Sequence, residues 1–178
     1  MTYWFIATEP FTQDGQGWSK FIEFSGLTQL KEVVSLDGLL CPPVLREIKD
    51  DYWPHIVNED FHLHFFVDFD FLMKQVAGIE VKNVLCVIRN PTHPPLPPPG
   101  AFEFLGYDLV DRECTVSALT NCGGFADIFS NSELSGCGLL SGFERAVEVQ
   151  QLLRSSYPND RHANCHLWAI FRLVTLNT

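Results

Sequence analysis

The sequence predicts an α+β fold, a single compact domain with a mainly antiparallel sheet and several flanking helices. Three observations favour this class: several segments alternate apolar and polar residues with the period of a β-strand, helical patterns fall between groups of these segments, and no internal repeat occurs. At 178 residues the chain is long enough to bury a core without disulfides or metals. We therefore expect residues 1–178 to form one domain.

The composition is that of a globular protein, with 46% hydrophobic residues, 19% charged residues and fifteen Phe. The formal net charge is −10, and clustered Lys and Arg are absent. Binding to nucleic acid or to an anionic membrane depends on such clusters, so we expect neither as a partner. The sequence has no apolar run of about 18 residues and no signal-peptide pattern at its start.

The six cysteines are scattered and form no Cys-x-x-Cys pair. This spacing indicates free thiols in a reducing compartment and not a disulfide framework. Together with the missing signal-peptide pattern, it predicts a cytoplasmic protein.

The first sixty residues predict two strands and two helices. Residues 3–7 and 18–24 have the alternation of short strands, with a DGQG turn between them. Apolar residues at helical spacing favour a helix over 27–37. A proline pair at the first positions favours a second helix over 42–53, which Pro54 would end.

The clearest strand pattern is FHLHFFVDFDFL, residues 61–72. All its odd positions are apolar, and its even positions are His62, His64, Phe66, Asp68 and Asp70. This alternation predicts a strand with one buried, Phe-rich face and a second face that presents two histidines and two aspartates. A short helix capped by Asp70 and a buried strand over 81–89 are expected next.

Residues 90–100, NPTHPPLPPPG, contain six prolines and predict an extended connection that separates the chain into two halves. A hairpin of 102–110 with 114–120 and a loop over 130–142 are expected after it. A capping box of Ser141 and Glu144 would open the clearest helix, which ends near Tyr157. Residues 166–176 are apolar on both faces and predict a central strand.

His62 and His64 are the first candidates for chemistry. On a strand, alternate side chains point the same way with Cα atoms about 6.5–7 Å apart, so two imidazoles can share one zinc or iron ion. A third ligand must come from another segment; His166 is the first choice, with His162 or Cys165 behind it. The alternative is that both histidines lie on the solvated face of a sheet.

Asp68 and Asp70 are the second candidates. Two carboxylates at the end of an apolar strand can hold Mg²⁺ while substrate phosphates complete its coordination. An apolar run followed by Asp-x-Asp resembles the signature of haloacid-dehalogenase-type phosphohydrolases and of nucleotide-sugar glycosyltransferases. For the former family, the resemblance implies Asp68 as nucleophile and Asp70 as acid/base, but Leu72 departs from the usual Thr or Val and the later acidic pair is not evident. The structural alternative is that Asp68 ends the strand and Asp70 caps a helix.

Cys122 is the third candidate, because it precedes two glycines whose backbone N–H groups could form an oxyanion hole, with His166 or His162 as base. The Cys-Gly-Gly triplet matches no specific thiol-hydrolase signature. The sequence also has no Walker loop, G-x-G-x-x-G, G-x-S-x-G or HExxH motif. No catalytic set is complete, so an enzyme is not the favoured class.

The sequence therefore favours a small acidic cytoplasmic protein that acts by binding a protein partner, and its charge favours a basic one. Bacterial immunity proteins of toxin systems are similar in style, as single acidic domains without catalytic motifs. The alternative is a metal-dependent hydrolase or transferase that uses the histidines and aspartates of residues 61–72 with Zn, Fe or Mg. No cofactor is favoured.

Overall fold

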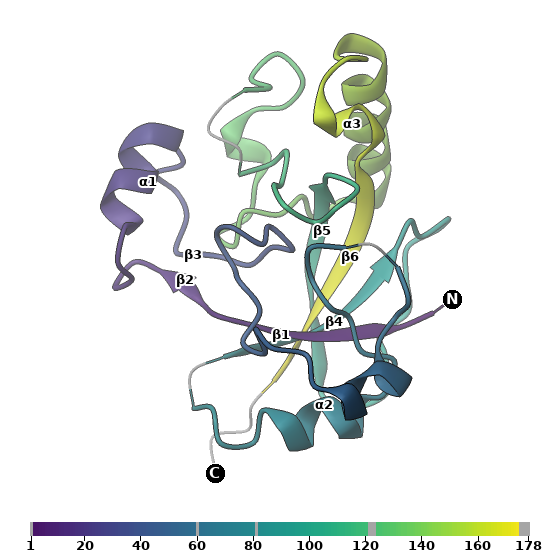
Figure 1. The fold of residues 1–178 in the computed structure, drawn as a ribbon. Helices are drawn as coiled ribbons and strands as arrows, with labels where there is room; N and C mark the ends of the chain where they lie inside the picture. Colours follow the sequence, from purple (N-terminus) through teal and green to yellow (C-terminus); the bar gives the residue numbers. More distant parts are fainter. Residues whose placement is uncertain (1, 60, 81, 121–123, 175–178) are drawn as a thin grey trace.

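A four-stranded antiparallel sheet with the strand order β1-β4-β6-β5 forms the centre of the molecule (Figure 1). The computed structural model describes residues 2–59, 61–80, 82–120 and 124–174. The predicted α+β class with a mainly antiparallel sheet is confirmed. The sheet strands are β1 (Trp4–Thr8), β4 (Asn83–Arg89), β5 (Phe102–Val110) and β6 (His166–Leu173).

β6 lies inside the sheet, between β4 and β5, as its uniformly apolar sequence predicts. Its residues from Leu167 to Phe171 are all buried, because side chains cover both of its faces. On one face, the ring of Trp168 stacks on Phe65 with 5.1 Å between the ring centroids. β6 therefore supports the packing on both sides of the sheet.

The sheet joins the two parts of the chain that the proline-rich residues 90–100 connect. β1 and β4 precede this connection, β5 and β6 follow it, and β4 pairs with β6. As predicted, residues 90–100 contain no helix or strand. They run beside the start of the chain, where the Tyr3 hydroxyl donates to the Leu96 carbonyl at 3.3 Å.

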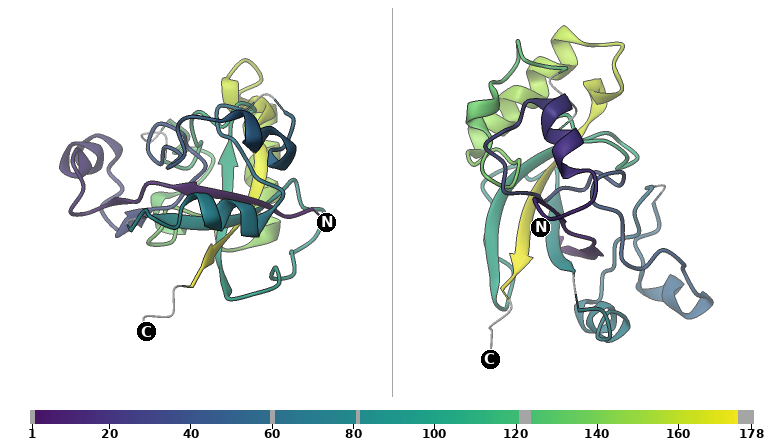
Figure 2. Two further views of the ribbon diagram at one scale, coloured as in Figure 1. Left: turned by 60° about the horizontal axis from the view of Figure 1, so that its bottom comes forward. Right: turned by 90° about the vertical axis from the view of Figure 1, so that its left-hand side faces the viewer.

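The helices α3 (Phe143–Ser156) and α2 (Phe69–Gln75) lie at opposite ends of the molecule. Figure 1 places α3 at the top and α2 at the bottom, and Figure 2 shows α1 (Trp18–Ser25) projecting to one side. Short elements complete the described part of the chain. They are the paired strands β2 (Phe11–Thr12) and β3 (Glu32–Val33) and the 3₁₀ helices η1 (Asp50–His55), η2 (Asn131–Glu133) and η3 (Arg161–Asn164).

The predicted strand over 18–24 is wrong, because these residues form α1. Trp18 and Phe21 are one helical turn apart and both pack against Phe11, with ring centroids 5.3 and 5.4 Å away. Gly17 and Gly26 adopt the left-handed conformation at the two ends of the helix. The packing of two aromatic residues three positions apart therefore favours a helix here more strongly than the alternating pattern favours a strand.

The predicted helices over 27–37 and 42–53 are also wrong. Residues 35–37 are held by hydrogen bonds to β5 and to Ser117, and not by a helical ladder. Residues 42–44 pair with β1 instead, since Val44 N–H donates to the Ala7 carbonyl and Glu9 N–H to the Pro42 carbonyl, both at 2.8–2.9 Å. Pro54 lies inside η1.

Residues 61–72 do not form the predicted strand. Residues 61–67 are irregular apart from bridges of Phe66 to Phe5 and Ile56, and α2 begins at Phe69. The predicted buried face is partly correct, because Leu63 and Phe65 are buried, but Val67 is 51% exposed and Phe66 is buried. Asp68, and not Asp70, caps α2 by accepting the Phe71 N–H at 2.9 Å.

Two predictions after residue 110 are corrected in detail. Residues 114–120 make one isolated bridge, from Ser117 to Val110, and do not form a hairpin strand. α3 spans the expected residues, but its N-cap residue is Gly142, which has no side chain to cap the helix, so the Ser141–Glu144 capping box does not form. The predicted strands over 81–89 and 102–110 correspond to β4 and β5.

Candidate functional site

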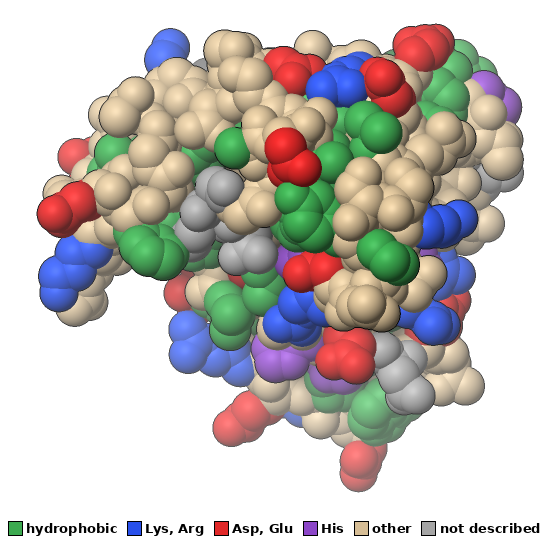
Figure 3. All heavy atoms as spheres, turned by 90° about the horizontal axis from the view of Figure 1, so that it is seen from above, with side chains coloured by type: hydrophobic (Ala, Val, Ile, Leu, Met, Phe, Trp, Pro, Cys, Tyr) green, Lys and Arg blue, Asp and Glu red, His purple; other side chains and the backbone are tan. Residues whose placement is uncertain are grey.

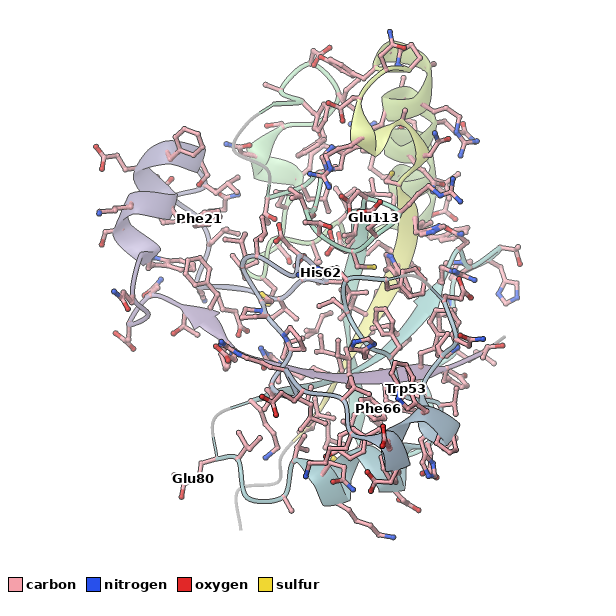
Figure 4. The ribbon with its side chains drawn as sticks, in the orientation of Figure 1. Phe21, Trp53, His62, Phe66, Glu80 and Glu113 are labelled. Atoms are coloured by element: carbon pink, nitrogen blue, oxygen red, sulfur yellow. The ribbon has the colours of Figure 1, made fainter. Side chains whose placement is uncertain are left out.

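The histidines proposed as metal ligands do not form a set. His62 is exposed, and its backbone N–H donates to the Glu113 carbonyl at 2.6 Å, so two distant segments meet there (Figure 4). His166 starts β6, and its Nδ1 lies 3.0 Å from Asn90 Nδ2. Among the described residues, no group of three or more His, Cys, Asp or Glu side chains could hold a metal ion.

Two of these histidines have lowered pKa values, and different neighbouring charges contribute to each. Burial lowers the pKa of His64, and the neighbouring His62 lowers it further. Burial also lowers the pKa of His166, and the positive charges of Arg89 and Arg112 act in the same direction, while Glu59 opposes them. Both imidazoles are therefore driven toward the neutral form.

Asp68 already has a structural role. Its Oδ1 accepts the Phe71 N–H at the start of α2, and its Oδ2 lies 3.4 Å from His55 Nδ1. The hydrogen bond from Phe71 is the main cause that lowers the Asp68 pKa, with His55 contributing. This is the structural alternative given above, with Asp68 in place of Asp70 as the cap.

Cys122, the proposed nucleophile, lies outside the described residues. Of its two proposed bases, His162 is buried and makes contacts through both ring nitrogens. Its Nδ1 lies 2.8 Å from Asp160 Oδ1, and its Nε2 lies 3.1 Å from the Val116 carbonyl. The His162 ring therefore serves to join η3 to residues 114–120.

The buried carboxylates of Asp37 and Asp108 were not among the sequence candidates. Asp108 on β5 accepts hydrogen bonds from the hydroxyls of Ser35 at 2.6 Å and Ser117 at 2.5 Å. Asp37 accepts from the backbone N–H groups of Leu39, Leu40 and Ser117. Burial raises the pKa of both carboxyls. Both are nearly inaccessible, so they fasten loops to the sheet; the available signal was one Asp within the apolar end of β5.

One surface combines exposed apolar side chains with acidic ones. Trp53 is 57% exposed and Val67 is 51% exposed, and the Trp53 ring meets the His64 ring edge-on at 6.2 Å. Figure 4 shows Trp53 toward the end of the molecule where α2 lies. We call this surface the Trp53 patch, which consists of Asp50, Asp51, Trp53, His64, Val67, Asp68 and Asp70.

Local packing holds the Trp53 patch in place. Val67 N–H donates to the His55 carbonyl at 2.9 Å, which joins η1 to the segment before α2. The His55 ring stacks on Phe71 with 3.8 Å between centroids, and the buried Tyr52 contacts the same ring edge-on. The end of η1 is therefore joined to the start of α2, and the two elements carry two aspartates each at their starts. Sequence reasoning found the aspartates of α2 but missed Trp53.

The face in Figure 3 shows Lys and Arg side chains among Asp, Glu, His and hydrophobic ones, without a continuous basic stripe on the described residues visible there. Within the described ranges, no helix is both long enough and apolar enough to cross a membrane. No family model, curated protein or solved structure matches this chain.

Proposed function

We propose that this protein acts by binding a basic protein partner through the Trp53 patch. The observation that supports this most is the exposure of Trp53, at 57%, when the other three tryptophans are 9% exposed or less. Exposing an indole costs hydrophobic free energy, and tryptophan is strongly enriched among the residues that dominate protein interfaces. Trp53 and Val67, the two exposed apolar side chains of the patch, would form the apolar centre of the interface.

The charges around Trp53 favour a basic partner. The patch contains four aspartates, at positions 50, 51, 68 and 70, whereas η1 with its N-cap residue and α2 contain two lysines, Lys49 and Lys74. Opposite potentials speed encounter and select the partner, while two copies of this patch would place like charges together. A partner segment with Lys or Arg around an apolar residue fits better than a second copy of the chain.

The proposed place of action is the cytoplasm. The described cysteines, Cys41, Cys86, Cys114, Cys137 and Cys165, are free thiols. Free thiols are typical of proteins in reducing compartments.

The test uses a synthetic peptide rich in Lys and Leu, and a second peptide in which every Lys is replaced by Gln. Binding is measured by calorimetry and by quenching of tryptophan fluorescence, to which Trp53 is the most accessible contributor. We expect the Lys peptide to bind, and Trp53→Ala to weaken it at least about 30-fold, the range of an interface hot spot. Phe24→Ala is the matched control, because Phe24 is 75% exposed on α1, outside the patch.

Several results would contradict the proposal. If the Gln peptide bound as tightly as the Lys peptide, charge would not contribute to binding. If Trp53→Ala bound the Lys peptide unchanged, the Trp53 patch would not be the binding surface. Self-association that Trp53→Ala abolishes would assign the patch to a second copy of the chain instead.

A further inference from the structure

A groove with the opposite charge lies along α3. Its volume is about 620 Å³, and it runs between α3, the start of β6 and residues 90–92. The described residues that line it include no Asp or Glu, although the whole chain has 22 of them. We call it the arginine groove, and its polar lining residues include Asn90, Arg112, Gln150, Arg154, Asn164 and His166.

The two arginines of this groove differ from the other arginines in the chain. Five of the seven arginines form ion pairs with carboxylates. Among the described residues, Arg112 and Arg154 have no carboxylate within the 4.0 Å of an ion pair. In a chain with net charge −10, acidic partners are plentiful, so two unpaired guanidinium groups in one groove indicate an external anion.

Hydrogen bonds hold the walls of the groove. Gln150 Nε2 donates to the Cys165 carbonyl at 2.9 Å, and Arg154 Nε donates to the Ala163 carbonyl at 3.4 Å, which leaves the terminal nitrogens of Arg154 available. Asn90 has a positive φ of 46° and is fixed by hydrogen bonds with the Leu167 backbone in both directions. Donors held in this way need little reorganisation when a ligand binds.

The groove also has an apolar wall, formed in part by Phe143 and Val147 of α3. Its volume falls in the range of about 300–1,000 Å³ that is typical of sites for small molecules. A ligand for this groove therefore needs both an anionic group and an apolar body.

We propose that the arginine groove binds a small organic phosphate monoester, whose phosphate Arg112 and Arg154 neutralise and whose apolar body packs on Phe143 and Val147. A carboxylate has one charge and is satisfied by a single bidentate arginine. A phosphate monoester has up to two charges and three acceptor oxygens, which match two guanidinium forks.

The test titrates the whole protein with phenyl phosphate, inorganic phosphate and benzoate, using calorimetry and the amide NMR signals of Asn90 and Gln150. We expect phenyl phosphate to bind saturably with one site, and inorganic phosphate, which has no apolar body, to bind at least about tenfold more weakly. Arg112→Gln and Arg154→Gln should each weaken the binding of phenyl phosphate at least about tenfold, as expected for loss of a charge-assisted hydrogen bond.

Arg46→Gln is the matched control, because Arg46 is exposed, pairs with Glu9 and lies outside the groove. Circular dichroism checks that each variant is folded. The proposal is overturned if phenyl phosphate does not bind saturably, if Arg46→Gln weakens binding as much as the groove variants, or if benzoate binds more tightly than phenyl phosphate.

Discussion

The Trp53 patch and the arginine groove differ in how their charges are partnered. In the patch, Asp68 caps α2 and meets His55, so its carboxylate already has partners within the protein. In the groove, Arg112 and Arg154 have no carboxylate partner among the described residues. Exposed aspartates are ordinary in so acidic a chain, and the exposed Trp53 is what distinguishes the patch. Unpaired arginines are unusual in this chain, so the charges themselves distinguish the groove.

Both surfaces depend on the same irregular segment, residues 61–67. His64 contacts Trp53 on the patch side, with ring centroids 6.2 Å apart. On the other side, Phe61 contacts His166 at 6.3 Å, and Phe65 stacks on Trp168 of β6. Changes in this segment should therefore test whether the two surfaces are held by one core.

The largest expected effect comes from Phe65→Ala. Phe65 is 1% exposed and packs on Trp4, Phe61 and Trp168, while its segment has few ladder hydrogen bonds to compensate. Removing a buried Phe ring costs about 3–5 kcal/mol of unfolding free energy. We expect a loss in this range in urea denaturation, together with increased acrylamide quenching of the buried tryptophans.

Phe65→Leu is the control, and we expect it to lose less, since it leaves a smaller cavity. Leu153→Ala, in the separate core under α3, should cost about 2–5 kcal/mol, because Leu153 is fully buried. If Phe65→Ala lowered the unfolding free energy by less than about 1 kcal/mol, the Phe65 ring would not be an important part of the core behind the patch.

A smaller effect is expected at the two aspartates of α2. Asp68→Ala removes the cap of the Phe71 N–H, and Asp68→Asn keeps a capping side chain but removes the Asp68 charge. Asp70→Ala leaves the cap and the Asp68 charge in place. The urea midpoint at pH 7 should therefore fall most for Asp68→Ala and least for Asp70→Ala. A larger loss for Asp70→Ala would show that the cap has been assigned to the wrong residue.

The pH dependence of the Asp68 effect follows from the direction of its pKa shift. The folded-state pKa of Asp68 is lowered, so its charge stabilises the fold above the unfolded-state pKa and loses this effect as the pH falls. The difference between the natural chain and Asp68→Asn should shrink below about pH 4, the usual range of an aspartate. A difference that stays constant down to pH 2 would contradict this origin.

The accuracy of the sequence predictions depended on where each segment pairs. β6 was predicted correctly because its buried residues have strand partners on both sides, and β4 and β5 supply these. Residues 61–67 have an equally strong apolar alternation, but they lie beyond β1 and form only isolated bridges. The spacing of hydrophobic residues indicates which side chains are buried. A β-strand also needs a neighbouring strand for its backbone hydrogen bonds, and the local sequence does not specify that neighbour.

The site residues follow the same rule. His62, His64, Asp68 and Asp70 were identified from their residue types on an assumed strand, and the real segment turns into α2 within it. The groove could not be predicted, because its residues come from the segments that follow β4 and β5, from α3 and η3, and from the start of β6. Arg112 and Arg154 have no local pattern that distinguishes them from the paired arginines; only tertiary structure shows which arginines have carboxylate partners.

The smallest expected effect is a change in the pKa of one histidine at each surface, His166 at the groove and His64 at the patch. The pKa of His166 is lowered by burial and by Arg89 and Arg112, whereas that of His64 is lowered by burial and by His62. Arg112→Gln removes one positive charge near His166, so it should raise the pKa of His166 and leave that of His64 unchanged. His62→Gln should do the reverse, and NMR titration of the ring protons measures both.

The same shift has a consequence for stability. A histidine whose folded-state pKa is lowered binds its proton more readily in the unfolded chain, so the fold loses stability as the pH falls through about 6.5, the usual histidine pKa. Because Arg112→Gln raises the folded-state pKa of His166, it should reduce the part of this loss that His166 causes. If Arg112→Gln instead changed the pKa values of both histidines equally, the patch and the groove would share one electrostatic environment. Their description as two independent surfaces would then be wrong.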